Sequence, residues 1–181
     1  MSWRLSKAAA QLREQIDDDY PERDRRSDGT VADSRHFASN PSSDHIPRDG
    51  IVRALDIDAN LNAHPEETYA LVEKMRKCAK RGDKRIKYII YDGKIMSGTL
   101  NWKRRKYRGP NPHKSHFHIS FTTLGDKDDS WFNLEGETNE RTQIDGGKLG
   151  EDIRSSSSSD LPSSRPGCQC DCKCRSSVSL A

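Results

Sequence analysis

Histidine and carboxylate side chains gather in two short stretches of the chain, in a pattern typical of a metal centre. Residues 43–58 combine a histidine with aspartates, and residues 113–118 contain three histidines. The side chains concerned are His45, Asp56, His113, His116 and His118. A catalytic zinc site uses about three such protein ligands and leaves a fourth position for water. The two stretches together therefore predict a zinc centre.

Alternating hydrophobicity predicts the strands that carry these side chains. In residues 116–121 every second side chain is aromatic or aliphatic, so the two histidines and Ser120 share the opposite face. In residues 51–58 the aliphatic side chains take one face, which leaves Asp56 and Asp58 on the other. Both aspartates lie on the polar face, so alternation alone does not choose between them as the ligand.

The rest of the pattern predicts an α+β fold, with a small, mainly antiparallel sheet and helices packed on one side. Apolar residues at mostly 3–4 spacing indicate an amphipathic helix over residues 3–16, and a second helix begins near Pro65. Residues 87–97 indicate a hairpin with a tight Asp-Gly turn. Residues 18–50 are polar and rich in turn formers, so we expect loops there.

Composition predicts one domain followed by a tail. The hydrophobic content is 31% and the mean hydropathy is −0.99, which indicates a modest core and a long solvated region. We expect a zinc peptidase-like domain over residues 1–124 and a polar, serine-rich, disordered tail over residues 125–181. The cysteines of Cys168–Cys174 alternate too closely for ordinary disulfides. They indicate either a soft metal site or simply part of the disordered tail.

The charge and hydropathy patterns bear on partners and location. No apolar run approaches the roughly 18 residues of a membrane helix, so we expect no membrane insertion. The first residues lack the apolar segment of a signal peptide, so we expect synthesis in the cytoplasm. Basic runs at residues 74–87 and 103–106 indicate solvated faces or attraction to an anionic polymer, either cell wall or nucleic acid.

Two motifs resemble those of a known enzyme superfamily. The stretch from Ser43 to Asp56 resembles the Ser-x-His-x-x-Gly-x-Ala-x-Asp signature of the D-alanyl-D-alanine peptidase and hedgehog-type zinc superfamily. The stretch from His113 to His118 resembles the His-x-x-His-x-His end of its murein-endopeptidase relatives. The layout of residues 2–124 is similar to that of small actinobacterial and phage peptidases of this group.

The resemblance implies a role for each residue that matches the motifs. The implied zinc ligands are His45, Asp56 and His118. His116 would orient or deprotonate the attacking water and stabilise the oxyanion, with His113 in support. Ser43 and Arg35 are the candidates for binding the carboxylate of the substrate. Zn²⁺ is the implied cofactor.

The sequence departs from the superfamily pattern at two points. The segment between His45 and Asp56 is longer than in the signature, so Asp58 stays a competing ligand. Ser115 stands where these enzymes usually have an acid, three residues before the last zinc histidine. The second departure favours a mechanism in which a histidine does the work of the acid.

The resemblance implies a monomeric metallopeptidase that cleaves peptidoglycan stem peptides, of endolysin or D,D-/L,D-peptidase type. It would act on the cell wall, in host-cell lysis or as part of a virion, and we do not expect nucleic acid as its partner. One alternative is a His-Asn-His-type nuclease, because Asp44-His45-Ile46-Pro47 resembles the core of that motif. The other is a non-enzymatic, zinc-stabilised binding module.

Overall fold

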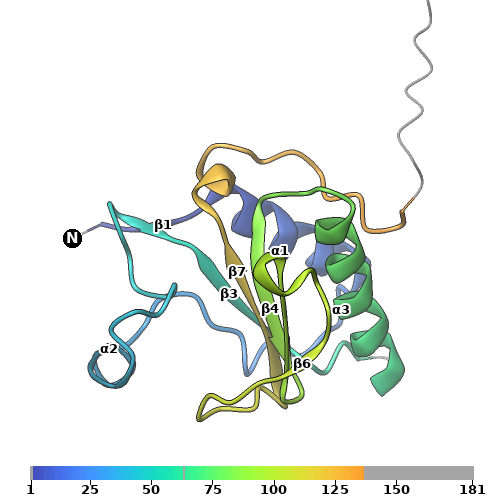
Figure 1. Cartoon of the computed structure of the whole chain (residues 1–181), viewed down its shortest axis with the longest axis horizontal. Coiled ribbons are helices and arrows are strands. Elements are labelled where there is room, and N and C mark those ends of the chain that lie inside the picture. Colours follow the sequence, from blue (N-terminus) through green and yellow to red (C-terminus); the bar gives the residue numbers. More distant parts are fainter. Residues whose placement is uncertain (1, 63, 137–181) are drawn as a thin grey trace, which may run out of the picture. The chain divides into compact units, whose positions relative to one another are not determined.

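A five-stranded antiparallel sheet, in the order β3-β7-β4-β5-β6, forms the centre of the fold (Figure 1). The computed structural model describes residues 2–62 and 64–136. The strands of this sheet are β3 (Ala54–Asp58), β4 (Ile86–Tyr91), β5 (Lys94–Ser97), β6 (Arg105–Lys106) and β7 (His116–Phe121). A short parallel pair, β1 (Arg4–Leu5) and β2 (Ile51–Val52), precedes it.

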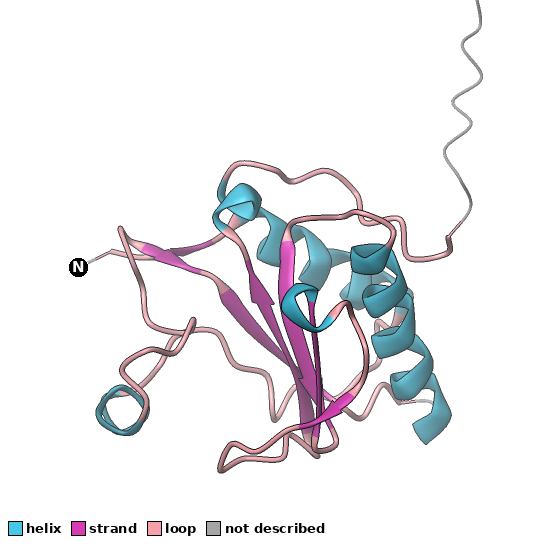
Figure 2. Cartoon of the chain, in the orientation of Figure 1, coloured by secondary structure: helices cyan, strands magenta, loops and turns pink. Residues whose placement is uncertain are grey.

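Two long helices cover one face of the sheet, and this confirms the predicted α+β class. They are α1 (Lys7–Asp19) and α3 (Pro65–Lys80). A short helix, α2 (Ser34–Ser39), lies on the other side of the sheet, within the long loop between α1 and β2 (Figures 1 and 2). Two 3₁₀ turns, η1 (Gly98–Leu100) and η2 (Thr123–Asp126), complete the described elements.

Local chemistry explains where the long helices begin. The Ser6 side chain accepts a hydrogen bond from the backbone N–H of Ala9, 3.3 Å away, which caps α1. The helix therefore starts at Lys7 and not at Trp3, because β1 pairs with β2 just before it. In α3 a proline occupies the first turn, and the adjacent glutamates complement the helix dipole.

The apolar face of the sheet and the two long helices enclose the core. Alternate residues of β3 and β7 point into it, as predicted, and they meet the buried faces of α1 and α3. The largest fully buried side chains include Leu12, Ile16, Leu55, Ile57, Leu71, Met75, Phe117, Ile119 and Phe121. The opposite face of β3 and β7 is consequently left for polar side chains.

The predicted hairpin is confirmed and contains one irregularity. Asp92 and Gly93 connect β4 to β5 with φ values of 43° and 67°, the left-handed conformations that a tight hairpin turn requires. The pairing of β4 with β7 shifts between Ile86 and Tyr88, which indicates a β-bulge at Lys87. A bulge re-aims the side chains that follow it.

The segment after Leu124 belongs to the folded domain, so the expected domain end at that residue is wrong. Phe132 is fully buried, its backbone exchanges two hydrogen bonds with the Gln15 side chain, and the guanidinium of Arg85 lies 3.7 Å from the centre of its ring. Asp126 forms an ion pair with Arg53 at 2.6 Å. The expected tail from residue 137 onward, with its cysteines, lies outside the described residues.

Within residues 2–62 and 64–136, no helix combines the length and apolarity that crossing a bilayer demands.

The packing of the final segment leads to a stability prediction. Phe132→Ala should lower the free energy of unfolding by about 3–5 kcal/mol, because it removes a fully buried ring. Trp131→Ala is the matched control, since that neighbouring ring is 62% exposed and its removal should cost no more than about 0.5 kcal/mol. Chemical denaturation measures both values, and equal losses would contradict the packing described.

Candidate metal centre

His45, Asp56 and His118 place three potential metal-binding atoms together on the polar face of the sheet. One atom from each lies within 4.8 Å of the other two. Oδ1 of Asp56 is 2.8 Å from Nδ1 of His118 and 3.2 Å from Nε2 of His45, and the two ring nitrogens are 3.1 Å apart. Two imidazoles and a carboxylate are a donor set that divalent transition metals bind.

Strand register and one loop bring the triad together. Asp56 on β3 stands directly opposite His118 on β7, so antiparallel pairing alone aligns these two side chains. His45 comes from the loop before β2, and its backbone carbonyl accepts a hydrogen bond from the N–H of Ala32. The loop thus completes a site that the sheet begins.

Hydrogen bonds on the outer side of each ring fix which nitrogen faces the triad. Nδ1 of His45 donates to the backbone carbonyl of Thr30 at 2.6 Å, and Nε2 of His118 lies at hydrogen-bond distance, 2.9 Å, from Oγ of Ser120, a hydroxyl that can accept or donate. When Nε2 of His118 carries the ring proton, the lone pairs of Nε2 of His45 and Nδ1 of His118 converge with a carboxylate oxygen. Such convergence is repulsive unless a cation or proton lies between the atoms.

The spacing of the three atoms also fits a metal. In a tetrahedral zinc site with bonds of about 2.0–2.1 Å, the ligand atoms lie about 3.3 Å apart. The observed separations of 2.8–3.2 Å are close to this value. The residues present therefore form a candidate metal-binding triad, although the geometry alone does not identify the metal.

Burial disfavours the charged forms of all three side chains, and the contacts that the side chains make with one another act against this effect. Burial disfavours protonation of His45, but the hydrogen bond and charge of Asp56 outweigh this and raise the pKa of His45. For His118 burial dominates, so its pKa is lowered. Burial also disfavours the Asp56 carboxylate, yet the hydrogen bonds that His118 and His45 donate when their facing nitrogens are protonated hold the pKa of Asp56 well below its usual range.

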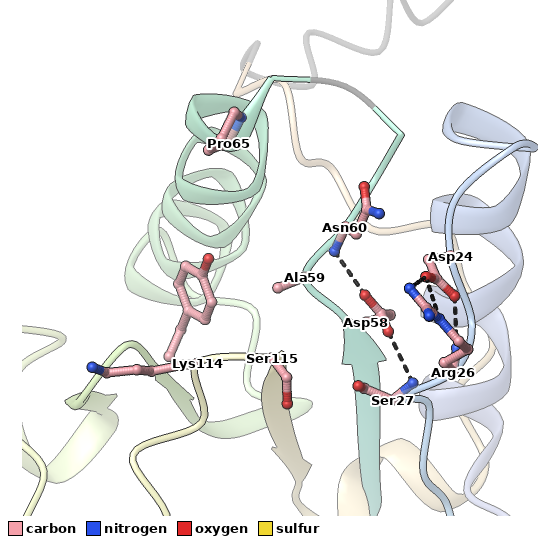
Figure 3. Close-up of a pocket in the computed structure, with 10 residues that line it drawn as sticks. Asp24, Arg26, Ser27, Asp58, Ala59, Asn60, Pro65, Lys114 and Ser115 are labelled. Atoms are coloured by element: carbon pink, nitrogen blue, oxygen red, sulfur yellow. Dashed lines mark hydrogen bonds and ion pairs between the residues drawn. The ribbon is translucent and has the colours of Figure 1, made fainter.

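Asp58, the competing candidate, has a different role in the structure. Its two carboxylate oxygens accept hydrogen bonds from the backbone N–H groups of Ser27 and Asn60, each at 2.8 Å (Figure 3). It lies beside a separate cavity of about 610 Å³ that Tyr91 and Lys114 also line. Because both of its oxygens accept backbone hydrogen bonds, Asp58 links two loop segments and does not join the triad.

Gly29 and Thr30 belong to the site, and our sequence analysis missed both. Gly29 exchanges two backbone hydrogen bonds with Asp56, at 2.8 and 3.1 Å. A Cβ atom at position 29 would lie 2.9 Å from Oδ2 of Asp56, so only glycine lets the chain approach this carboxylate. The sequence Asp28-Gly29 is typical of a turn, but it does not predict a contact with β3.

His116 and His113 border the triad without joining it. Nε2 of His116 is 3.9 Å from Oδ2 of Asp56, and its Nδ1 lies 3.2 Å from Oγ of Ser115. The ring of His113 lies 5.0 Å from that of His116, measured between centroids. The Nδ1 atom of His113 is buried without a hydrogen-bond partner among the described residues, and burial lowers the pKa of His113 to about 4. His113 is therefore neutral at neutral pH.

Ser43 and Arg35, the two candidates for substrate binding, lie in different environments in the structure. Ser43 is buried beside the triad, where its Oγ accepts a hydrogen bond from the backbone N–H of His45 and lies 2.9 Å from Nε2 of His36. The Arg35 side chain is 93% exposed and pairs with Asp33. The structure thus brings Ser43 and the unanticipated His36 to the site, but it does not bring Arg35 there.

A cavity of about 360 Å³ opens over the triad and gives a ligand access to it. Its walls combine hydroxyl, amide and aromatic groups from α2, β4 and the loop before β7. They include Ser39, Asn40, Tyr88, Tyr107 and Asn111. Histidines aside, Asp56 is the only side chain that is charged at neutral pH among the described residues that line this cavity.

Comparison with known proteins adds no relative. The chain matches no family model, and searches of curated proteins and of solved structures returned no significant match.

Replacing the two aspartates in turn tests which of them binds metal. Asp56→Asn should abolish stoichiometric zinc binding, because it removes a charged ligand at the centre of the triad. Asp58→Asn should keep one zinc and lower the melting temperature, because one backbone N–H loses its charged acceptor. Metal analysis and thermal unfolding of both variants decide the assignment, and the opposite pattern would reverse it.

Proton competition gives a second test of the triad. The pKa of His45 is raised in the metal-free protein, so metal binding must displace a proton as the pH falls through that pKa. Zinc affinity should therefore fall on acidification, by about tenfold per pH unit for each proton displaced, and level off above the raised pKa. Competition titrations across about pH 5–8 measure the slope. Affinity that does not change over this range would exclude histidine ligation.

Proposed function

We propose that this chain is a zinc-dependent metallopeptidase that hydrolyses peptide bonds in the stem peptides of peptidoglycan. The observation that carries the proposal is a candidate metal triad with a further histidine, His116, 3.9 Å from the same Asp56 carboxylate and facing an open cavity. Two histidines and one carboxylate are a ligand set of catalytic zinc in peptidases. The resemblance of both histidine stretches to murein peptidases supports the substrate class and the cell wall as the place of action.

The protein residues divide into those that hold the metal and those that handle the substrate. Zinc, held by His45, Asp56 and His118, would supply Lewis acidity that activates water and polarises the scissile carbonyl. The outer hydrogen bonds of the two histidines would keep their donor nitrogens oriented. The donor atoms already lie close to the spacing of a tetrahedral site, so only small displacements would be needed to hold the metal.

His116 is suited to move the proton. If Nδ1–H donates to Oγ of Ser115, Nε2 keeps a free lone pair on the side of Asp56 and the cavity. That nitrogen would accept a proton from the attacking water and return it to the leaving amine. The nearby Asp56 carboxylate would stabilise the imidazolium formed between these two steps.

His113 is suited to contact the substrate as a neutral group. Its backbone adopts a left-handed conformation with φ of 54°, and its N–H donates to Oδ1 of Asn111. This arrangement leaves the ring beside those of His116 and His118, with Nδ1 buried and without a partner. The ring lines the cavity over the triad, which fits the supporting role implied by the resemblance, while the buried Nδ1 is out of reach of a substrate.

The cavity walls suit a peptide. Hydroxyl and amide side chains can pair with backbone amides, while Tyr88 and Tyr107 offer apolar surface. Ser43 is in place to contact substrate, whereas Arg35 would have to leave Asp33 and turn toward the site to do so. We therefore retain Ser43 in the proposal and give Arg35 no role.

The alternatives have less support in the geometry. In a His-Asn-His nuclease the histidine of the motif would work with a downstream asparagine or histidine. Here the imidazole of His45 faces Asp56 and His118, while Asn60 lines the separate cavity of Figure 3. A zinc-stabilised binding module would not need His116 and an open cavity beside the triad.

One variant tests the function and its alternatives together. His116→Ala should keep zinc and fold, yet it should lose roughly 10²-fold or more in turnover on purified murein, because it removes the proton acceptor. The assay measures soluble peptide ends released from murein, with supercoiled plasmid DNA as a parallel substrate.

Each alternative predicts a different outcome in this assay. A nuclease would cut the plasmid with or without His116, and a binding module would turn over neither substrate. Wild-type hydrolysis of murein by zinc-loaded His116→Ala would refute the proposed role of this histidine while leaving the metal centre intact.

A further inference from the structure

Positive charge is concentrated in the part of the chain that forms β5, β6 and the loop before β7. Residues 93–125 contain seven lysines and arginines and no aspartate or glutamate. The whole chain has a net charge of only +3, so the remaining residues together carry an excess of negative charge. The proposed catalytic site uses the histidines of this segment and none of its lysines or arginines.

Backbone hydrogen bonds gather five of these cations around the turn that joins β4 to β5. The carbonyl of Gly93 accepts a hydrogen bond from the N–H of Tyr107 at 2.8 Å, and the N–H of Gly93 donates to the carbonyl of Pro112 at 2.7 Å. The loop that follows β6 therefore folds around the turn (Figure 1). We call the five residues the basic rim: Lys94, Arg105, Lys106, Arg108 and Lys114.

The charges of the basic rim are not neutralised within the described residues. All five side chains are exposed, and none has an ion pair or a hydrogen bond to another described residue. Arg104, in the same basic run, instead pairs with Glu73 at 2.7 Å. Lys94 stands directly opposite Lys106, and like charges in that position destabilise a sheet. An anionic partner would remove this repulsion.

Acidic side chains near the rim have other partners. The carboxylate of Asp92, in the turn itself, accepts a hydrogen bond from the hydroxyl of Tyr69 at 2.9 Å. Figure 3 shows the ammonium group of Lys114 directed away from Asp24 and Asp58, which lie across the cavity drawn there. The positive charge of the rim therefore faces solvent.

The basic rim borders the cavity over the metal triad. Residues 107, 110, 111 and 113 line that cavity, and Arg108 and Lys114 lie between or directly after them in the chain. A polymer that contacts the rim would therefore pass close to the mouth of the cavity.

Strand register also places one rim residue on the same face of the sheet as the triad. His118 pairs with Ile90, Ile90 with Ile95, and Ile95 with Arg105. Directly paired residues share a face, and neighbouring strands lie about 4.8 Å apart, so Arg105 follows His118 across the sheet by roughly 14 Å. The rim and the triad can therefore contact one extended ligand assembly at two separate points.

The chemistry of the rim favours a flexible phosphodiester polymer over nucleic acid. Lysine and arginine both bind phosphate oxygens. Proteins that hold single-stranded nucleic acid add aromatic rings on which the bases stack. The two aromatic rings beside the rim already have ring partners, because Tyr107 packs against His113 and Tyr69 packs against Tyr91. The rim thus offers charge without a free stacking surface.

We propose that the basic rim binds the phosphodiester backbone of an anionic cell-wall polymer while the neighbouring cavity takes the stem peptide. Contact at the rim would hold the protein on its insoluble substrate and raise the local concentration of stem peptides at the cavity. The choice of the cell wall as the source of the polymer rests on the proposed function. The binding itself requires neither metal nor hydrolysis.

Binding of full-length protein to fluorescently labelled poly(glycerol phosphate), measured by anisotropy over a range of salt concentrations, tests the proposal. The logarithm of the affinity should fall linearly with the logarithm of the salt concentration, because each contact releases counterions. The triple variant Lys94→Gln/Arg105→Gln/Lys106→Gln should make this slope shallower by about two and lower the affinity roughly 10²-fold at about 0.1 M salt.

A second triple variant controls for the change in net charge. Lys77→Gln/Lys80→Gln/Lys84→Gln removes three exposed cations from the end of α3 and the loop after it, and the side chains of these lysines likewise have no partner among the described residues. Its affinity should fall by less than about threefold, because salt screens charges that do not contact the polymer. Thermal unfolding checks both triple variants, and Arg108→Gln alone should still make the slope shallower by about 0.7.

A single-stranded oligonucleotide with the same number of phosphates forms the other arm of the experiment. Tighter binding of the oligonucleotide than of poly(glycerol phosphate) would overturn the assignment to the cell wall. Failure to bind the polymer, or equal losses in the two triple variants, would overturn the rim as a binding surface and leave the peptidase proposal standing. The expected losses without any hydrolysis of murein would support the rim and reject only the peptidase assignment.

Discussion

The antiparallel register between β3 and β7 is the constraint on which the rest of the site depends. It sets Asp56 directly opposite His118 and Asp58 opposite His116, so a single pairing determines the order of polar groups along the sheet. Because side chains alternate across a strand, a slip by one residue would move these groups to the core face. The burial of Leu55, Ile57 and Phe117 prevents that slip, so the hydrophobic core also keeps the candidate metal centre in register.

The two faces of β3 and β7 contribute to the stability of the fold with opposite signs. On one face the core gains free energy from burying apolar side chains against α1 and α3. On the other face, His45, His118 and Ser120 are buried polar groups, which destabilise a fold unless each one has partners. Backbone carbonyls, hydroxyls and the Asp56 carboxylate supply those partners. Order in the site therefore comes from a hydrogen-bonded network that a stable core can support.

How much the sequence could predict depends on the range of the interactions. Alternation within β7 and the Asp-Gly turn are local signals, and both led to the right elements. The loop between α1 and β2 has no periodicity, so its contacts with β3 through Gly29 could not be foreseen. The choice of Asp56 over Asp58 likewise depends on which backbone N–H groups surround each carboxylate. Phe132 was visible as an apolar residue, but its partners, Gln15 and Arg85, are remote in sequence.

The backbone bridge between Gly29 and Asp56 has a consequence for the solubility of the protein. Strand β3 lies at the edge of the sheet, and an open edge offers unpaired backbone groups to the strands of other molecules. The bridge occupies the N–H and carbonyl of Asp56 with a loop that ends its pairing after one residue. The same loop that confines the carboxylate of the site thus blocks the growth of the sheet beyond β3, so changes that free the loop would favour self-association through this edge.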